Sequence, residues 1–206
     1  MSLTRRAALM GLTGLALAAC VGPGASFKTE YTQVPPVLAA GWKLGDVQVS
    51  VPRTLTASEA KTYLPTADIV WREDPMGDRY AQVEAIIETA VRRGAAGLSG
   101  GRRVIIAVTV TRFHALTFEA EQRFENAGVH NIRLVAQVAD AATGEVLVPP
   151  TPIRAELPAL SGKAMREARR KGQSQKSMIT DHVAKTVAGW LGLGPDVRGS
   201  FSRQGN

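Results

Sequence analysis

The sequence is poor in three residue types that often reveal how a protein is cross-linked or what it binds. Its 206 residues include one cysteine, three histidines and only 5% aromatic residues. One cysteine excludes an internal disulfide, so the fold has to be stable without a covalent cross-link. Three histidines leave few ligands for a transition metal. We therefore expect a single domain with an aliphatic core and no cofactor, because the length suits one domain rather than two.

The chain also lacks an apolar run long enough to cross a membrane. Its most apolar segment, residues 7–19, has 13 residues and follows Arg5 and Arg6. A helix of this length is too short for a hydrocarbon core of about 30 Å. A basic start followed by a short apolar run is the layout of an export signal. The leader therefore predicts a protein outside the cytosol, and it leaves open whether export uses the Sec or the twin-arginine route.

The only cysteine, Cys20, ends this apolar run in the sequence LAAC (residues 17–20). The leader resembles that of bacterial lipoproteins, in which such a cysteine becomes the first mature residue and carries a diacylglyceryl group. The resemblance implies that Cys20 is the lipidation site and anchors the protein to a membrane. Val21 follows where an aspartate often marks inner-membrane retention, so we expect the periplasmic face of the outer membrane, with that of the inner membrane as the alternative. A buried structural cysteine is the other interpretation.

Composition divides the chain into four segments. We expect a signal peptide over residues 1–19 and a lipidated N-terminus with a flexible tether over residues 20–40, where Gly and Pro are frequent. A single α/β domain should follow over residues 41–193. Residues 194–206 should form a flexible C-terminal tail.

Positive charge is concentrated in the C-terminal quarter. The whole chain has a formal net charge of +7, and residues 161–206 hold nine basic and three acidic side chains. Arg166, Arg169, Arg170 and Lys171 are candidates for contact with anionic lipid headgroups or an acidic partner. The alternative is a solvated helix face that keeps the protein soluble. Export, and the lack of aromatic residues in this stretch, argue against a nucleic-acid partner.

Hydrophobic periodicity predicts five strands and two helices. The expected strands cover residues 42–52, 67–74, 102–116, 129–140 and 145–157, and the expected helices follow Asp74-Pro75 and cover residues 178–191. Gly45 predicts an irregularity in the first strand. The prolines at 149, 150 and 152 place the last strand at a sheet edge or a bulge.

The order of these elements predicts an α+β fold. We expect a mostly antiparallel sheet with two helices packed on one face, which is a two-layer sandwich. In the first helix, Val83, Ile87 and Val91 recur at helical spacing and should face the sheet.

Residues 67–90, ADIVWREDPMGDRYAQVEAIIETA, together with the leader, resemble an uncharacterised family of bacterial outer-membrane lipoproteins. More distantly, the layout is similar to the auxiliary lipoproteins of ABC-type lipid transport systems. These resemblances imply an accessory of an envelope transport system and supply no catalytic residue.

An enzyme is the alternative class. Ser99 lies in GLSGG (residues 97–101), which formally fits the pattern of a nucleophile elbow. Such an elbow needs a strand before the serine and a helix after it, and here the predicted order is reversed. The carboxylates near the first helix, Glu73, Asp74 and Asp78, are explained by helix capping.

A metal site is the other catalytic possibility. His114 and His130 lie near the end of one predicted strand and the start of the next, so antiparallel pairing would bring them close. Asp140 or Glu119 would complete the ligand set, whereas hydrogen bonding at strand ends is the simpler explanation. The sequence thus favours a lipid-anchored, periplasm-facing binding or assembly module without catalytic or metal residues. The alternative is an envelope hydrolase or metal-dependent enzyme that uses Ser99 or the His114/His130 pair.

Overall fold

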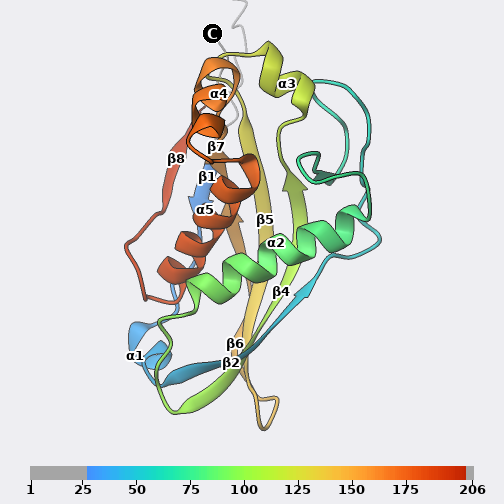
Figure 1. The fold of residues 1–206 in the computed structure, drawn as a ribbon. Helices are drawn as coiled ribbons and strands as arrows, with labels where there is room; N and C mark the ends of the chain where they lie inside the picture. Colours follow the sequence, from blue (N-terminus) through green and yellow to red (C-terminus); the bar gives the residue numbers. More distant parts are fainter. Residues whose placement is uncertain (1–26, 203–206) are drawn as a thin grey trace, which may run out of the picture.

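A computed structural model describes residues 27–202 of the protein (Figure 1). Its strands are β1 (Phe27–Glu30), β2 (Trp42–Ser50), β3 (Ile69–Val70), β4 (Arg102–His114), β5 (Val129–Asp140), β6 (Val146–Ala155), β7 (Leu157–Pro158) and β8 (Gly199–Phe201). Its helices are α1 (Pro36–Ala39), α2 (Arg79–Gly94), α3 (Phe118–Arg123), α4 (Gly162–Arg170) and α5 (Gln175–Trp190).

The sheet pairs its strands in both directions. The strand order is β2-β4-β5-β6-β1-β8, and β3 and β7 pair with β4 and β5 respectively. Both β2 and β3 run parallel to β4, whereas the remaining pairs are antiparallel. The long strands β4, β5 and β6 therefore lie in the interior of a mixed sheet.

The predicted fold class is wrong in two respects. The sheet is mixed and has eight strands rather than five, and residues 27–202 contain five helices rather than two. The connection from β2 to β4 contains α2, and a long crossover of this kind allows a parallel pair, whereas a short turn produces an antiparallel one. The additional helices have four to nine residues, which is too short for a clear hydrophobic period.

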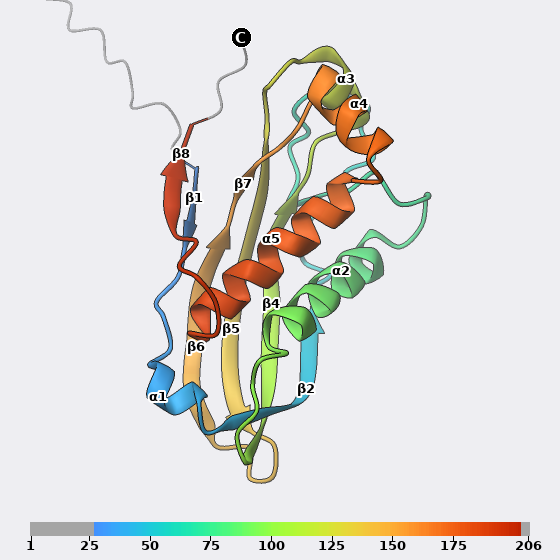
Figure 2. The ribbon, with the colours of Figure 1, turned by 60° about the vertical axis from the view of Figure 1, so that its left-hand side comes forward.

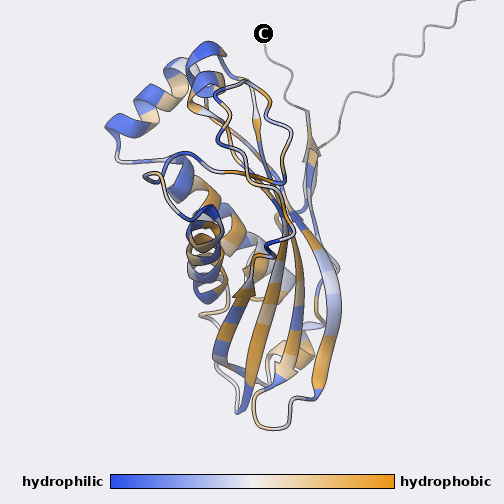
Figure 3. Cartoon of the chain, turned by 90° about the vertical axis from the view of Figure 1, so that its right-hand side faces the viewer, coloured by the Kyte–Doolittle hydropathy of each residue, from blue (hydrophilic) through white to orange (hydrophobic). Residues whose placement is uncertain are grey.

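Helices α2 and α5 pack side by side against one face of the sheet (Figure 2). Val83, Ile87 and Val91 of α2 are fully buried, as their spacing predicts. Ile179 and Val183 of α5 belong to the same core. In the described chain no helix lies over the opposite face (Figure 3). One face of the sheet is therefore closed by helices, and we call the other the open face.

Helix α2 begins later than the sequence predicts. Its N-cap is Asp78, whose Oδ1 accepts hydrogen bonds from the backbone N–H groups of Tyr80 (2.9 Å) and Ala81 (3.2 Å). A capping side chain of this kind satisfies N–H groups that the helix leaves free. Asp74, the expected cap, accepts a hydrogen bond from the indole N–H of Trp71 instead, at 2.8 Å.

Two strand irregularities occur where particular residues predict them. The register between β2 and β4 shifts between Leu44 and Asp46, so Gly45 lies in a bulge as expected. Strand β6 lies between β5 and β1, but β1 covers only Arg154 and Ala155. The prolines at 149, 150 and 152 therefore have no outer neighbour in β1, and the register with β5 shifts in the same stretch.

Both ends of the described chain belong to the sheet. Strand β1 pairs with β6 on one side and β8 on the other, and the rings of Phe27 and Phe201 lie 6.0 Å apart between centroids. Residues 27–40, expected to belong to a flexible tether, thus include β1 and α1, and residues 199–201 of the expected tail form β8. Strands of three or four residues are too short to be recognised from alternation.

Candidate functional site

Three arginines stand side by side on the open face. Arg112 of β4 pairs in register with Arg133 of β5, and Arg133 pairs with Arg154 of β6. Their chain neighbours Phe113 and Leu134 are buried in the core, and successive side chains of a strand alternate between faces. We call Arg112, Arg133 and Arg154 the arginine row. Like charges directly opposite one another destabilise a sheet, so the row requires negative charge nearby.

One buried carboxylate, Glu156, supplies part of that charge. Its side chain is 0% exposed, and it accepts hydrogen bonds from Nε of Arg133 at 3.0 Å and Nη2 of Arg154 at 2.8 Å. The backbone N–H of Lys28 in β1 also donates to it, at 2.8 Å. Burial alone would raise the pKa of Glu156, but the hydrogen bonds from Arg154, Lys28 and Arg133 lower it below its ordinary value. Glu156 therefore joins β1, β5 and β6 as an ionised group at neutral pH.

Arg112 has no such carboxylate among the described residues. Its Nη2 donates to Nδ1 of His114 at 2.8 Å, and its Nε is buried without a hydrogen-bond partner in residues 27–202. Asp68 interacts with Arg112 electrostatically, without a hydrogen bond between them. The Oδ2 atom of Asp68 accepts a hydrogen bond from the hydroxyl of Thr56 instead, at 2.8 Å. The positive charge of Arg112 is thus the least compensated in the arginine row.

The contact with Arg112 fixes the state of His114. A guanidinium can only donate, so Nδ1 of His114 accepts and the proton of the neutral ring lies on Nε2. Burial, together with the charge of Arg112, lowers the pKa of His114 to about 4. At neutral pH His114 is therefore an uncharged hydrogen-bond donor through Nε2.

A cavity of about 290 Å³ opens beside Arg112 and His114. Asn131, which pairs in register with His114, completes the polar part of its wall, and the buried Oδ1 of Asn131 has no hydrogen-bond partner in the described chain. The remaining wall is formed by Phe27, Tyr63, Leu64, Ala115, Leu116, Gly128 and Val129. This volume is close to the lower limit of small-molecule pockets, about 300 Å³. We call this cavity the Arg112 pocket.

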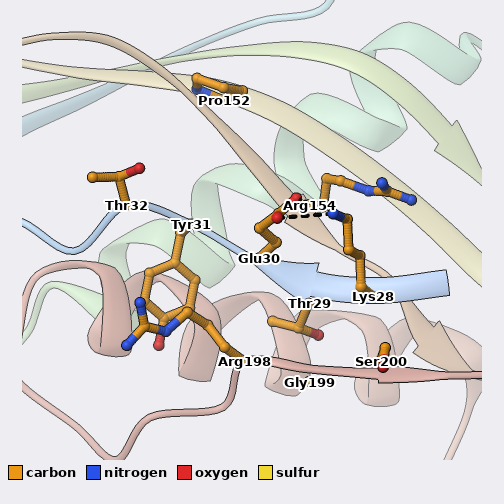
Figure 4. A pocket seen from close by; sticks show the side chains of 10 residues that line it. All are labelled: Lys28, Thr29, Glu30, Tyr31, Thr32, Pro152, Arg154, Arg198, Gly199 and Ser200. Atoms are coloured by element: carbon orange, nitrogen blue, oxygen red, sulfur yellow. Dashed lines mark hydrogen bonds and ion pairs between the residues drawn. The ribbon is translucent and has the colours of Figure 1, made fainter. Parts of the chain in front are cut away.

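A wider groove of about 490 Å³ lies at the other end of the arginine row, over β1, β6 and β8 (Figure 4). Its cations are paired with carboxylates: Lys28 with Glu30, Arg154 with Glu156 and Arg198 with Asp196. The guanidinium of Arg198 also lies over the ring of Tyr31, 5.2 Å from its centroid. Because these charges are compensated internally, the groove offers a ligand less electrostatic attraction than the Arg112 pocket.

Ser99 lies apart from the histidines. It is exposed in the loop between α2 and β4, where its backbone forms an isolated antiparallel β-bridge with Lys43. Strand β4 runs from Arg102 to His114, and at about 3.3 Å per residue it separates these two ends by about 40 Å. The structure therefore does not bring Ser99 together with His114, nor with His130 at the adjoining end of β5.

His114 and His130 are close in the sheet but lie on opposite faces. The residue that pairs with His114 is Asn131, and its neighbour His130 is 0% exposed in the layer below the helices. Asp140 ends β5 at its far end, and Glu119 lies in α3. The part of the chain that the structure describes contains no group of three or more His, Cys, Asp or Glu able to hold a metal ion.

His130 interacts instead with His182 of α5. Neither ring nitrogen of His130 has a hydrogen-bond partner among residues 27–202, whereas Nε2 of His182 lies 2.9 Å from Oγ1 of Thr29. Burial and the neighbouring His182 lower the pKa of His130 to about 3. Burial and the charge of Lys185 lower the pKa of His182 to about 4. Both rings are therefore neutral at pH 7.

Two of the four predicted basic contacts take part in ion pairs within the fold. Arg169 lies 3.0 Å from a carboxylate oxygen of Glu73 and 2.9 Å from one of Glu121. Arg166 lies 3.7 Å from Glu125. These pairs connect α4 with its surroundings, so both arginines have a structural role.

The other two, Arg170 and Lys171, are exposed where α4 ends. No carboxylate of the described chain forms an ion pair with either of them. They are free to contact an anionic partner, and that role remains a prediction.

The carboxylates near the start of α2 serve two helices rather than one. Asp78 caps α2, whereas Glu73 accepts hydrogen bonds from the backbone N–H groups of Gln175 (3.0 Å) and Lys176 (2.6 Å) at the start of α5. Asp74 also contacts Nζ of Lys176, at 2.9 Å. The predicted capping of the first helix therefore holds for Asp78, whereas Glu73 and Asp74 connect to the start of α5.

Cys20, the predicted lipidation site, lies outside the described residues. Within residues 27–202, no helix has both the length and the apolar character needed to span a membrane.

The arginine row was not predicted from the sequence. Its members lie in the segments TRFH (residues 111–114), NIRLV (131–135) and PIRAE (152–156). An arginine directly beside a large apolar residue in each of three successive strands is the signal that would have pointed to the row.

The fold and the site define an α/β domain with one helical layer and a basic, open sheet face. The chain belongs to a family of unknown function, DUF6778, whose model matches residues 42–206. This confirms the prediction of an uncharacterised family. No curated protein matches the chain.

Solved structures with some similarity share little sequence with this chain. The dodecamer of a PelC variant from Paraburkholderia phytofirmans has 14% identity and a TM-score of 0.34, covering 82% of this chain and 98% of the other. The PelC dodecamer in a second crystal form has 12% identity and a TM-score of 0.32, covering 80% and 97%. A "putative lipoprotein" from Caulobacter crescentus CB15 has 14% identity and a TM-score of 0.35, covering 53% and 83%. None of these comparisons supports the distant resemblance to ABC-type transport auxiliary lipoproteins.

Proposed function

We propose that this protein is a lipid-anchored binding or assembly module of the bacterial cell envelope, which faces the periplasm from the outer membrane. Cys20 carries the lipid, and the domain acts by binding an envelope protein rather than by catalysis. The observation that carries the proposal is the open face of the sheet with its arginine row. Helices α2 and α5 cover much of the other face, so the open face is the more extended surface of the sheet that remains for a partner.

The charge of this face indicates the chemistry of the partner. Arg112 has no carboxylate of its own, and Arg133 and Arg154 share the single carboxylate of Glu156. Two guanidinium groups on one carboxylate leave net positive charge at the surface. An acidic partner would compensate this charge and bind with electrostatic complementarity. Arg170 and Lys171 provide an auxiliary basic contact at the end of α4.

The leader supports the anchor, and the placement of the candidate catalytic residues favours binding over catalysis. Cys20 follows a short apolar run with the residue order of a lipoprotein leader. Ser99 and the histidines occupy separate places, and His114 and His130 lie on opposite faces of the sheet. A hydrolytic triad needs its nucleophile and base within hydrogen-bond reach.

The anchor is tested by changing Cys20 and Val21. We expect Cys20→Ala to move the protein from the membrane fraction to the soluble periplasmic fraction, and Val21→Asp to move it to the inner-membrane fraction. Immunoblots of fractionated cells measure both. Retention of Cys20→Ala in the membrane pellet after a high-salt wash would contradict lipid anchoring.

The binding face is tested by photo-crosslinking in cells. Gln137 lies between buried Ala136 and Val138 on the open face, whereas Glu84 is exposed on α2. A photo-reactive residue at Gln137 should give a specific adduct of higher mass, and the same residue at Glu84 is the matched control on the helical side. Reversal of Arg133 to Glu should remove the adduct. Equal adducts from both positions would refute the assignment of the face.

A further inference from the structure

We infer that the Arg112 pocket binds a small amphiphilic carboxylate, with the carboxylate on Arg112 and His114 and an aliphatic chain against the apolar wall. This inference goes beyond the proposed partner surface, because it assigns a small-molecule site at one end of the arginine row. It rests on the proposed function in one respect: the lipid anchor at Cys20 holds the pocket near a membrane, which supplies the ligand.

Two of the three polar side chains of the pocket, those of Arg112 and His114, are suited to an acceptor with negative charge. The guanidinium of Arg112 donates one hydrogen bond to His114, and its Nε has no hydrogen-bond partner among the described residues. Because Nδ1 of His114 accepts that bond, Nε2 carries a proton and is a second donor. An ionised carboxylate can only accept hydrogen bonds, and it would also compensate the charge of Arg112.

The apolar wall and the volume indicate the size of the chain. Leu64 is 86% exposed and Tyr63 is 49% exposed at the mouth of the pocket, and Leu116 contributes further apolar surface. At about 30 Å³ per water-sized group, a cavity of about 290 Å³ holds about ten non-hydrogen atoms. Octanoate has about this size, so an eight-carbon carboxylate fills the pocket.

The position of the pocket favours a ligand derived from lipid. Phe27, the first residue of β1, lines it. Phe27 lies seven positions after Cys20, and an extended chain spans at most about 3.5 Å per residue, which gives at most about 25 Å. With Cys20 as the lipid anchor, the pocket is held close to the membrane, where fatty carboxylates are released by lipid hydrolysis.

Binding is measured by equilibrium dialysis of radiolabelled octanoate against the full lipidated chain in nanodiscs, with empty nanodiscs as the blank. We expect saturable binding of one octanoate per chain. Octylammonium, which has the same chain and the opposite charge, should not compete. Arg112→Gln should weaken binding about tenfold or more, because it removes a charge-assisted hydrogen bond.

Matched variants separate the pocket from general effects on the fold. Leu64→Asp should weaken binding severalfold, whereas Met76→Asp, at a residue that is also 86% exposed, should leave it unchanged. Arg103→Gln, at an exposed arginine near the opposite end of β4, should also leave octanoate binding unchanged. Thermal unfolding of each variant verifies that the domain is folded.

Four results would overturn the inference. These are no saturable binding above empty nanodiscs, competition by octylammonium as strong as by octanoate, unchanged affinity in Arg112→Gln, and unchanged affinity in Leu64→Asp. Each of them leaves the crosslinking result at Gln137 and the fractionation of Cys20→Ala unaffected, so failure of the pocket is distinguishable from failure of the proposed function.

Discussion

Replacement of Glu156 by Gln tests whether one buried carboxylate holds three strands together. The side chain is 0% exposed and accepts hydrogen bonds from the backbone N–H of Lys28 and from the guanidinium groups of Arg133 and Arg154. Hydrogen bonds that involve a charged group contribute about 1 kcal/mol more than neutral ones, so three donors give about 3 kcal/mol. Arg133 and Arg154 are 44% and 28% exposed, and water around them reduces the expected loss of unfolding free energy to about 2 kcal/mol.

Urea unfolding followed by circular dichroism measures this loss, and a decrease of roughly 4–8 °C in the melting temperature should accompany it. Hydrogen exchange gives a local measure, because the amide of Lys28 loses its charged acceptor and should exchange faster. The control is Glu145→Gln, which removes an exposed ion pair with Arg102 and should cost at most about 1 kcal/mol. If Glu156→Gln is as stable as the wild type, the carboxylate does not hold the arginine row and the reasoning is refuted.

Two further predictions concern the helical layer. Gly94→Ala should destabilise the domain by about 1–3 kcal/mol in urea unfolding, because an added Cβ would lie 2.5 Å from the carbonyl oxygen of Ala184 in α5. The control is Gly101→Ala, where an added Cβ would have no atom within 4 Å. Stability should also fall as the pH decreases from about 6.5 towards 4, because burial lowers the pKa of His130 to about 3 and that of His182 to about 4. The pKa of His114 on the open face, also about 4, adds to the effect, so the unfolded chain binds protons that the folded one does not. The loss between pH 6.5 and pH 5 is up to about 5 kcal/mol, and equal urea midpoints at pH 7.5 and pH 5 would contradict it.

The elements that were predictable carry their signal within one segment. Val83, Ile87 and Val91 mark the buried face of α2 through local spacing, and Gly45 marks a bulge through its own backbone freedom. Strand β5 has the predicted limits, Val129–Asp140. In each case the residues that determine the structure are neighbours in the sequence. A pattern of this kind is independent of how the segments later pair.

Pairing itself was less predictable, because it depends on segments far apart. The sequence indicated a helix between the strands that became β2 and β4, but the direction of pairing follows from the crossover rather than from either strand. Strands β1 and β8 have three or four residues. Strand β1 forms because it pairs with β6 and its Lys28 N–H donates to Glu156, and β8 forms by pairing with β1. These partners lie far away in the sequence, so the short segments themselves do not indicate them.

The arginine row shows why the candidate site needed the structure. Val110 of β4 faces the core, and simple alternation would then place Arg112 in the core as well. The register between β4 and β5 shifts between Val110 and Arg112, and this bulge turns Arg112 to the open face and Phe113 into the core. A shift of one residue exchanges the two faces of a strand, so the same sequence without the bulge would bury an unpaired guanidinium. The Arg112 pocket and the arginine row therefore depend on one bulge in β4. No glycine or proline lies at this bulge, so the sequence does not indicate it.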